Sequence, residues 1–580
     1  MADTHARSRR KRERKDSTPA ARAAAAPSSP GLLTRLIHAP AWMLALGFAA
    51  LHLVLAIAAF NPSPYAGGDN ATYMALARSL AEHHRYLELW DPAMRPHTQY
   101  PPLWPAFLAL LWMVGLRGWT VMKTVVLLCS VGAVGVSYLW LRRTSTAGVA
   151  FCAALLLAMA PGILELSHWE LSDQPSWVLT MVAFWAATHL AGTREREGET
   201  VERRHGLWLG VLVAAVVLGN FVRAAGLPLV VATVAWLGMR RRWKDVAVLA
   251  AVFLPPAILW WLWGHANGAP GYTSFLWNVD PYRPAEGTVT LLTMAERLLA
   301  NGDRYAFMHL PVMLYWNAQM PAVVTVPFLA AAIAGWARRL RKPGLTEVWV
   351  PLYVGLLMVW PSTWSGERFL LPLMPLMLCY AAEALRDVAA WFGVPMLRRA
   401  IPLAAGVLLL LVSFAGIHNV VSAGRECSAA YANGETLPCM NQEYHDLLRL
   451  AEITRGTLPP GTVVLSRKAT LWYALSGYPS RTYPLSANPD TFFAFARKSG
   501  AAYVAFDNIR DLAPLYLHPV VLAHREMFCV VPGTFLPAAS LLRIERGPPP
   551  PPGTAPGAMR MCESGPTAQS PAPPQPRFGG

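Results

Sequence analysis

The chain contains few charged residues, and acidic residues are the scarcer kind. Asp, Glu, Lys and Arg make up only 14% of its 580 residues, whereas ordinary soluble domains contain about 25%. Hydrophobic residues make up 54% of the chain, and apolar runs of membrane-spanning length recur from Ala39 to Ile417. This composition excludes an ordinary soluble protein and predicts a polytopic α-helical membrane protein.

Several catalytic signatures are missing from the sequence. It has no P-loop, no G-x-S-x-G and no kinase signature, so neither ATP-driven chemistry nor serine hydrolysis is supported. It also has no C-x-x-C or H-E-x-x-H pattern, and its histidines lack the spacing of metal ligands, so we predict no metal site.

The formal net charge is +16. Basic residues are concentrated in the N-terminal stretch "ARSRRKRERK" and in short clusters between apolar runs: Arg142/Arg143, Arg203/Arg204, Arg240 to Arg242, Arg338 to Lys342 and Arg398/Arg399. This distribution is typical of cytoplasmic loops. We therefore attribute the charge to membrane topology and expect no nucleic-acid partner.

We predict about eleven crossings from the apolar runs. They cover residues 39–60, 120–140, 147–165, 175–191, 207–222, 224–239, 246–263, 320–336, 348–363, 369–385 and 401–417. The run "YPPLWPAFLALLWMVG" (100–115) is short and rich in proline, and counting it would invert the charge of every later loop. We interpret it as a juxtamembrane or re-entrant helix, which places the N-terminus inside and the C-terminus outside.

The chain divides into four parts. Residues 1–30 and 546–580 are predicted to be disordered, the first basic and the second Pro-rich. Residues 31–418 form the transmembrane domain, and 419–545 read as an extracytoplasmic α/β domain with strands at 461–466, 481–485 and 501–507. The stretch "SRKATLWYALSGYPSRTYPL" (466–485) has basic and aromatic residues that could contact a glycan, but we favour an ordinary α/β surface.

Four of the seven cysteines follow the last predicted span. Cys427 and Cys439 both occupy a polar, loop-like stretch, so they are the disulfide pair that we expect if this part lies outside the cytoplasm. The sequence alone does not determine the pairing.

Acidic residues mark the outer ends of two apolar runs. Asp69, in "GGDNATYMALARSL", and Asp173, in "SHWELSDQPSWVL", can each be read as a helix cap. Ionisable groups at a membrane boundary are also candidates for a functional site. Because the two lie on consecutive loops of the same face, together with Glu170, they favour an acidic site between them.

Two arginines accompany these carboxylates on the predicted outer face. Arg223 is flanked by apolar runs, so it either reaches water by snorkelling or binds an anion. Arg368, with Glu367 beside it, is either an interfacial anchor or a second basic group of a site. Candidate substrate contacts on this face are Asn70, Tyr73, His83, His84, Arg85, His168, Glu170 and Glu367.

Taken in order, these motifs resemble a known class of enzyme. "GGDNATYMALARSL", "YPPLWPAFLALLWMVG", "SHWELSDQPSWVL", "VRAAGLPL" and "GERFLLPLMP" are similar to segments of the GT-C class of polyprenyl-phosphate-sugar-dependent glycosyltransferases. The likeness is greatest to bacterial relatives of the protein O-mannosyltransferases and of the lipid A aminoarabinose transferase. It covers roughly residues 35 to 420.

The resemblance implies a multi-pass enzyme of the bacterial inner membrane that transfers a hexose or pentose from a lipid-phosphate carrier. The acceptor, a glycan, lipid or protein outside the cytoplasm, is not specified. Asp69 matches the first-loop catalytic carboxylate and Asp173 the second-loop acidic residue, while Arg223 and Arg368 fall where the donor phosphate would bind. Many relatives carry an acidic pair in the first loop, but here Asn70 follows Asp69. No cofactor is expected, although a divalent cation is left open.

Chemistry supports this assignment, because a base must take the acceptor's proton and cations must hold the leaving phosphate. Two alternatives remain open at this stage. One is a transferase or ligase for lipid-linked oligosaccharides, and the other is a transporter or flippase for lipids or sugars. Transporters commonly show paired repeats, and none is visible in this sequence.

Overall fold

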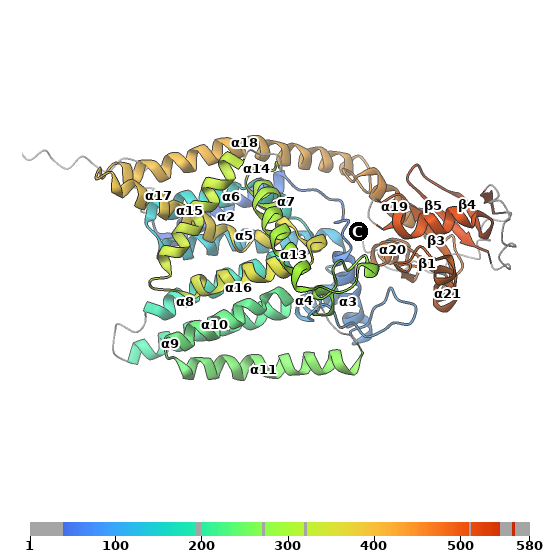
Figure 1. Ribbon diagram of the computed structural model, residues 1–580, viewed down its shortest axis with the longest axis horizontal. Helices are drawn as coiled ribbons and strands as arrows, with labels where there is room; N and C mark the ends of the chain where they lie inside the picture. Colours follow the sequence, from blue (N-terminus) through green and yellow to red (C-terminus); the bar gives the residue numbers. More distant parts are fainter. Residues whose placement is uncertain are drawn as a thin grey trace, which may run out of the picture. The chain divides into compact units, whose positions relative to one another are not determined.

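The apolar runs fold as helices in the computed structural model. It describes residues 37, 39–192, 199–268, 273–317, 322–509, 512–545 and 559–562. The predicted disordered segment 1–30 lies outside the described residues. Residues Pro40–Gly580 form one structural unit, in which a helical bundle is followed by an α/β domain (Figure 1).

Each predicted span contains a helix. The helices are α2 (Ala41–Ala58), α5 (Trp119–Thr144), α6 (Ala147–Met159), α8 (Asp173–Gly192), α9 (Glu199–Val222), α10 (Leu227–Met239), α11 (Trp243–Ala266), α15 (Ala322–Arg339), α16 (Leu345–Val359), α17 (Met374–Trp391) and α18 (Leu397–Ala432). Within the described residues, 6 helices are both long and apolar enough to cross a membrane. The protein is therefore a polytopic helical membrane protein, and the total of about eleven crossings stays a prediction.

Two of the predicted spans differ from the helices observed. Residues 147–165 are divided between α6 and the short α7 (Pro161–Leu166), because Pro161 lacks the N–H that would continue α6 and instead starts a new helix. The last span is longer than predicted. α18 has 36 residues and is about 54 Å long, nearly twice the hydrocarbon thickness of a bilayer. The predicted domain boundary at 418/419 therefore falls inside a helix that leads to the α/β domain (Figure 1).

Shorter helices lie between the long ones. They are α3 (Asp69–His83), α4 (Leu103–Met113), α12 (Thr273–Leu276), α13 (Leu291–Arg304) and α14 (Leu310–Tyr315), with a π-helical turn at Tyr305–His309. α4 has 11 residues and is about 16 Å long, too short to cross a bilayer, which agrees with a juxtamembrane helix. α13 exposes Leu291, Leu292 and Leu299, as expected of an amphipathic helix at a membrane interface.

The long helices pack through small residues and apolar faces. α5 packs against both α2 and α8, α8 also packs against α9, and α15 packs against α17. At the last of these contacts a Cβ on Gly335 would collide with the backbone carbonyl of Tyr380. Glycine at that position therefore permits a backbone approach that no larger residue would allow.

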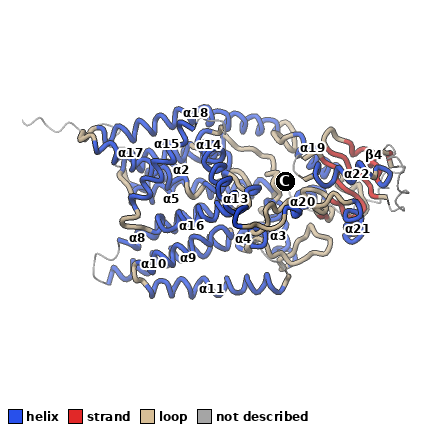
Figure 2. The backbone as a smooth tube through the Cα atoms, viewed as in Figure 1, coloured by secondary structure: helices blue, strands red, loops and turns tan. Residues whose placement is uncertain are grey.

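The C-terminal domain is built on a six-stranded mixed sheet of order β2-β1-β3-β5-β4-β6, whose strands are red in Figure 2. The strands are β1 (Val463–Leu465), β2 (Ser480–Arg481), β3 (Ala501–Asp507), β4 (Phe528–Phe535), β5 (Ala539–Ile544) and β6 (Arg560–Met561). β1 runs parallel to β2 and β3, β5 runs antiparallel to β3 and β4, and β6 runs parallel to β4. The accompanying helices are α19 (Gln442–Ile453), α20 (Ala469–Ser476), α21 (Pro489–Ser499) and α22 (His518–Ala523).

The structure agrees with the predicted α/β segment and corrects its end. Strand 501–507 is observed as predicted, whereas the predicted strand 481–485 contributes only Arg481, in β2. Cys427 and Cys439 form the expected disulfide. A second disulfide, between Cys529 and Cys562, was not predicted from the sequence. Residues 560–561 also form β6, so the described part of the supposed disordered tail is folded, because a disulfide and strand pairing hold it. The other residues of 546–580 lie outside the described residues.

Candidate active site

The polar segments predicted to share the outer face do come together. They line a cavity of about 620 Å³ whose walls include Asp69, Tyr73, Arg223 and Arg368, as well as Tyr282 from the loop before α13. These residues come from chain segments separated by up to 299 positions, the interval between Asp69 and Arg368. The juxtaposition inferred from the sequence is therefore present in the fold.

Asp69 is not used as a helix cap. It is the first residue of α3, and the capping position belongs to Gly68, whose φ of 101° is in the left-handed region and which makes no side-chain capping bond. Instead, the hydroxyl of Tyr100 donates a 2.8 Å hydrogen bond to Oδ1 of Asp69. Oδ2 lies 3.4 Å from Nη1 of Arg368, and 33% of the side chain is exposed. The carboxylate is therefore accessible from the cavity.

Asp173 has a different environment. It is the first residue of α8 and is only 7% exposed. Its Oδ2 accepts a 2.8 Å hydrogen bond from Nη1 of Arg223 and lies 3.9 Å from Nη1 of Arg368. Asp173 does not line the large cavity, so it lies behind the two arginines rather than beside Asp69.

The two arginines are held as a pair around one aromatic ring. The guanidinium carbons of Arg223 and Arg368 lie 5.1 and 5.2 Å from the centre of the Phe369 ring. Burial disfavours the charged form of both groups, but the carboxylate of Asp173 and weaker favourable interactions together outweigh burial and raise both pKa values above their usual range. Arg223 and Arg368 therefore contribute two permanent positive charges to the cavity wall.

Tyrosines complete the polar wall. Tyr73 follows Asp69 by one helical turn and so lies on the same face of α3. Its hydroxyl is 3.0 Å from Oγ of Ser172, which also accepts a 3.2 Å hydrogen bond from Arg223. Burial raises the pKa of Tyr65 to about 12, and it raises that of Tyr73 as well. Both are therefore neutral and can serve as hydrogen-bond donors at ordinary pH.

Four predicted substrate contacts lie elsewhere. Asn70 is fully buried and does not line the cavity, because adjacent helical residues point about 100° apart. His83, His84 and Arg85 are exposed near the C-terminal end of α3. His83 is 14 positions from Asp69, which corresponds to about 21 Å along the helix. We therefore remove these residues from the candidate site.

His168 and Glu170 belong to the core beneath the site. Both are buried, and their neighbour Lys123, on α5, was not predicted as part of this region. Nζ of Lys123 lies 3.2 Å from Oε1 of Glu170 and donates to the backbone carbonyl of His168 at 3.0 Å. Oε2 of Glu170 accepts the backbone N–H of Tyr65 at 3.0 Å. A single lysine within an apolar run predicts a buried acidic partner, so Lys123 was the signal from which its pairing with Glu170 could have been predicted.

Glu367 lines the cavity, as proposed, but its partner was not foreseen. Its Oε2 lies 3.4 Å from Nδ1 of His309. Burial acts to raise the pKa of Glu367, but the hydrogen bond from His309, followed by smaller favourable contacts, outweighs burial and lowers it. The carboxylate is therefore charged at neutral pH.

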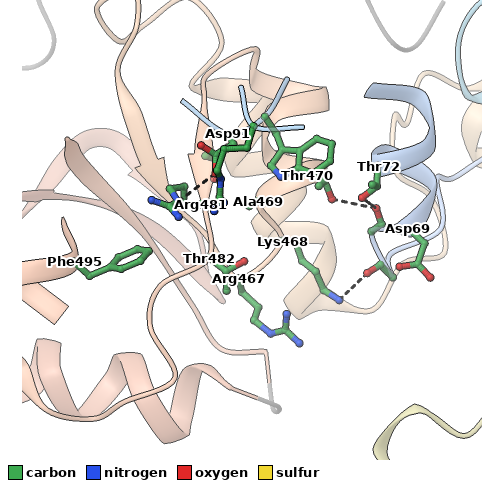
Figure 3. Close-up of a pocket in the computed structure, with 15 residues that line it drawn as sticks. Asp69, Thr72, Asp91, Arg467, Lys468, Ala469, Thr470, Arg481, Thr482 and Phe495 are labelled. Carbon is green, nitrogen blue, oxygen red and sulfur yellow. Dashed lines mark hydrogen bonds and ion pairs between the residues drawn. The ribbon is translucent and has the colours of Figure 1, made fainter. Parts of the chain in front are cut away.

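The α/β domain contributes directly to the site, which contradicts our preferred reading of 466–485 as an ordinary surface. Arg467 and Lys468 line the same cavity as Asp69. Nζ of Lys468 donates to the carbonyl of Gly67 at 3.2 Å, and Oγ1 of Thr470 donates to that of Gly68 at 3.1 Å (Figure 3). These two bonds hold the turn that precedes Asp69, and no local sequence pattern predicts them.

The arrangement of apolar helices, membrane-boundary helices and a C-terminal α/β domain is shared with solved structures. The chain has the fold of the polyprenyl-phosphate-dependent glycosyltransferases of the GT-C class. No protein-family model and no curated protein matches it, so this finding comes from solved structures.

Three of those structures are informative. An oligosaccharyltransferase from Archaeoglobus fulgidus, tethered with an acceptor peptide, superposes with a TM-score of 0.52 at 11% identity, over 84% of this chain and 72% of that one. The oligosaccharyltransferase AglB of that organism, with an inhibitory peptide and a dolichol-phosphate, gives 0.51 at 12% identity, over 84% and 73%. ArnT from Cupriavidus metallidurans, bound to undecaprenyl phosphate, gives 0.50 at 16% identity, over 86% and 97%. At these identities the likeness establishes the fold.

Proposed function

We propose that this protein is an integral-membrane glycosyltransferase that moves a sugar from a polyprenyl-phosphate donor to an acceptor outside the cytoplasm. The observation that carries the proposal is the arrangement around Asp69. An accessible carboxylate that caps no helix faces the same cavity as two charged arginines. Base and phosphate-binding cations are the two elements that this reaction requires.

The reaction is a single displacement at the anomeric carbon. Asp69 takes the proton of an acceptor hydroxyl while the hydroxyl oxygen bonds to the anomeric carbon. The bond from that carbon to the phosphate oxygen breaks, and polyprenyl phosphate leaves with the electron pair. Arg223 and Arg368 stabilise the charge that develops on the phosphate. One displacement inverts the anomeric configuration, so retention in the product, observed by NMR, would contradict this mechanism.

Asp173 has a supporting role in this proposal. It is buried behind the arginines and pairs with Arg223 at 2.8 Å, so we assign it as a positioning residue rather than a second catalytic carboxylate. Tyr100 has a similar role toward Asp69, because its hydrogen bond orients the carboxylate.

We also propose that transfer needs no divalent cation. Nη1 of Arg368 lies 3.4 Å from Asp69 and 3.9 Å from Asp173, so a positive charge already lies between the two carboxylates. The next residue, Asn70, is neutral and buried. Chelation with EDTA should therefore leave the transfer rate unchanged, and a loss restored by Mg²⁺ or Mn²⁺ would show that a metal is required.

The proposed orientation places the N-terminus in the cytoplasm and the α/β domain outside the bacterial inner membrane. Two disulfides in and around the α/β domain support this, because structural disulfides persist in oxidising compartments. The basic clusters support it too, since Arg240, Arg339 and Lys342 line a separate cavity at the other end of α8. Labelling of single introduced cysteines with an impermeant reagent in spheroplasts would test it.

The function is tested by transfer from labelled polyprenyl-phosphate sugars to a cell-envelope extract. Wild-type protein should move label from lipid to acceptor, and Asp69→Asn should reduce the rate by about 10²–10⁴-fold. Asp490→Asn, at an exposed carboxylate in the first turn of α21, is the matched control and should retain activity. Equal activity in wild type and Asp69→Asn would assign the base elsewhere.

Oligosaccharide transfer is the second candidate, because oligosaccharyltransferases are among the structures that share this fold. The same assay distinguishes the two when the donor panel includes both monosaccharide and preassembled oligosaccharide carriers. Transfer from the monosaccharide donor alone would exclude the second candidate.

A further inference from the structure

A second cavity of about 470 Å³ adjoins Asp69 on the side of the α/β domain (Figure 3). It shares Gly67, Asp69, Arg467 and Lys468 with the larger cavity. The rest of its wall comes from the first loop of the bundle and from the α/β domain. Neither Arg223 nor Arg368 lines it. Asp69 is therefore common to two cavities, of which only the first contains the proposed phosphate-binding pair.

The wall of the second cavity is basic. It contains the cationic side chains of Arg95, Arg467, Lys468 and Arg481, against the carboxylates of Asp69 and Asp91. A lining with such an excess of one sign attracts ligands of the opposite sign. Guanidinium groups in particular bind carboxylate and phosphate through paired hydrogen bonds.

The wall is also rigidly assembled. Asp91, with 3% of its side chain exposed, lies 2.6 Å from Nη2 of Arg95 and 3.4 Å from Nε of Arg481. The backbone N–H of Ser480 donates to the carbonyl of Trp90 at 2.7 Å. These contacts join the first loop to β2 of the α/β domain. Arg95 and Arg481 are therefore held in position before any ligand binds.

Arg467 holds a central place in this wall. It is 9% exposed, and its guanidinium carbon lies 5.3 Å from the centre of the Tyr282 ring. Figure 3 shows Arg467 and Lys468 extending from the same segment, with Lys468 directed toward the turn before Asp69. Trp90 and Phe495 also line the cavity and offer aromatic faces on which a sugar ring can pack.

We propose that this second cavity binds the acceptor, and that the acceptor is a saccharide with an anionic substituent, a phosphate or a carboxylate, near its attacking hydroxyl. The inference rests on the proposed function. A single displacement requires the nucleophile to approach opposite the leaving phosphate, with the base on the nucleophile's side. Asp69, shared by both cavities, is the only proposed base, and the second cavity supplies the space on its other side.

The test measures binding of small saccharides to the full-length protein in nanodiscs, without any donor. Glucose 6-phosphate, glucuronic acid and glucose are compared by calorimetry. We expect a charged saccharide to bind about tenfold or more tightly than glucose, because charge-assisted hydrogen bonds are stronger than neutral ones. The stronger of the two charged probes identifies phosphate or carboxylate as the substituent.

A variant at a residue that lines only this cavity assigns the binding to it. Arg481→Gln should weaken binding of the charged sugar, because Arg481 lines the second cavity and not the first. Arg467→Gln and Lys468→Gln should each lower the affinity for the charged sugar about tenfold and leave the affinity for glucose unchanged. Arg497→Gln, an exposed arginine of the same domain, and Arg368→Gln, in the first cavity, should leave the affinity for the charged sugar unchanged. Arg467→Lys keeps the charge and controls for misfolding, so it should bind better than Arg467→Gln.

Three outcomes would overturn the proposal. They are equal affinity for charged and neutral sugars, no saturable binding of either charged sugar at millimolar concentration, and binding abolished by Arg368→Gln but not by Arg481→Gln. The last would assign the anion to the donor cavity. The binding test contains no donor, so its result does not depend on transfer. If charged saccharides bind but no transfer occurs, the proposed function alone is rejected. If transfer occurs but binding does not distinguish charged from neutral saccharides, this inference alone is rejected.

Discussion

Two clusters of arginine and carboxylate lie at opposite ends of α8, and they are built differently. At the end that begins with Asp173, Arg368 approaches Asp69 and Asp173 at 3.4 and 3.9 Å. At the other end, Arg339 donates through Nε and Nη2 to the two oxygens of Glu383, both at 2.8 Å. Nη2 of Arg339 also donates to the carbonyl of Thr144 at 2.9 Å.

Both clusters line cavities, so a cavity alone does not identify a site. The difference is in how completely the guanidinium is satisfied. The Arg339 pair is bidentate, and the nearby Glu347 accepts from Tyr380 at 2.9 Å and from the backbone N–H of Gly344 at 2.7 Å. Such a pair joins helices. Arg368 engages its carboxylates loosely from one nitrogen, so it can turn toward an incoming phosphate.

The largest effect should come from breaking the closed cluster. Arg339→Gln leaves Glu383 buried without its partner, which should lower the free energy of unfolding by about 3–5 kcal/mol. Thermal unfolding in detergent measures this. Arg341→Gln, at an exposed position of the same basic segment, is the control and should unfold like wild type. An unchanged unfolding temperature for Arg339→Gln would remove the distinction between the clusters.

Arg368→Gln should have the reverse profile. Transfer should fall about 10²–10³-fold, because one donor to the developing phosphate charge is lost, while the unfolding temperature stays close to that of wild type. Arg283→Gln, with 53% of its side chain exposed, should alter neither. If Arg368→Gln lost stability as Arg339→Gln does, the loose cluster would also be structural.

Lys123 and Glu170 sharpen the comparison, because they form a closed pair just beneath the open cluster. Lys123→Met alone should cost about 3 kcal/mol of unfolding free energy, since it leaves Glu170 buried and unpaired. The double variant Lys123→Met/Glu170→Leu should recover part of this loss, although not the bond from Glu170 to the N–H of Tyr65. Additive losses in the double variant would contradict pairing.

The smallest effect concerns Glu367 and pH. Its pKa is lowered in the folded protein, so its contribution to stability is present above the unfolded value of about 4.3 and is lost as pH falls through the folded pKa. The unfolding temperature should therefore fall on acidification in this range. His309→Gln should make that fall shallower. An identical pH profile in the variant would show that His309 does not stabilise the carboxylate.

Local pattern predicted the elements whose cause is local. The apolar runs became helices, and 501–507 became β3, because hydrophobic period and length are written in neighbouring residues. The start of α21 also has a local cause, because the Asn488 side chain accepts hydrogen bonds from the backbone of Asp490 and Thr491. β4 and β5 were missed because their pairing depends on partners distant in the chain.

Site residues were predicted as a set, but their individual environments were not. Asp69, Glu170 and Asp173 look alike in the sequence, as acidic residues near the ends of apolar runs. In the fold, Glu170 is paired with Lys123, Asp173 lies behind two arginines, and only Asp69 is accessible. Arg467 and Lys468 were assigned to an ordinary surface because nothing in their segment predicts that it meets the first loop.

The sequence by itself determined that the chain is a helical membrane protein with charged groups gathered where its helices end, because bilayer insertion depends on the composition of each run. Only the tertiary structure decided which of those charges is available for chemistry. The surroundings of a carboxylate depend on partners that can be distant in the chain, as Arg368 is 299 positions from Asp69. Over such intervals, packing rather than local sequence decides which groups meet.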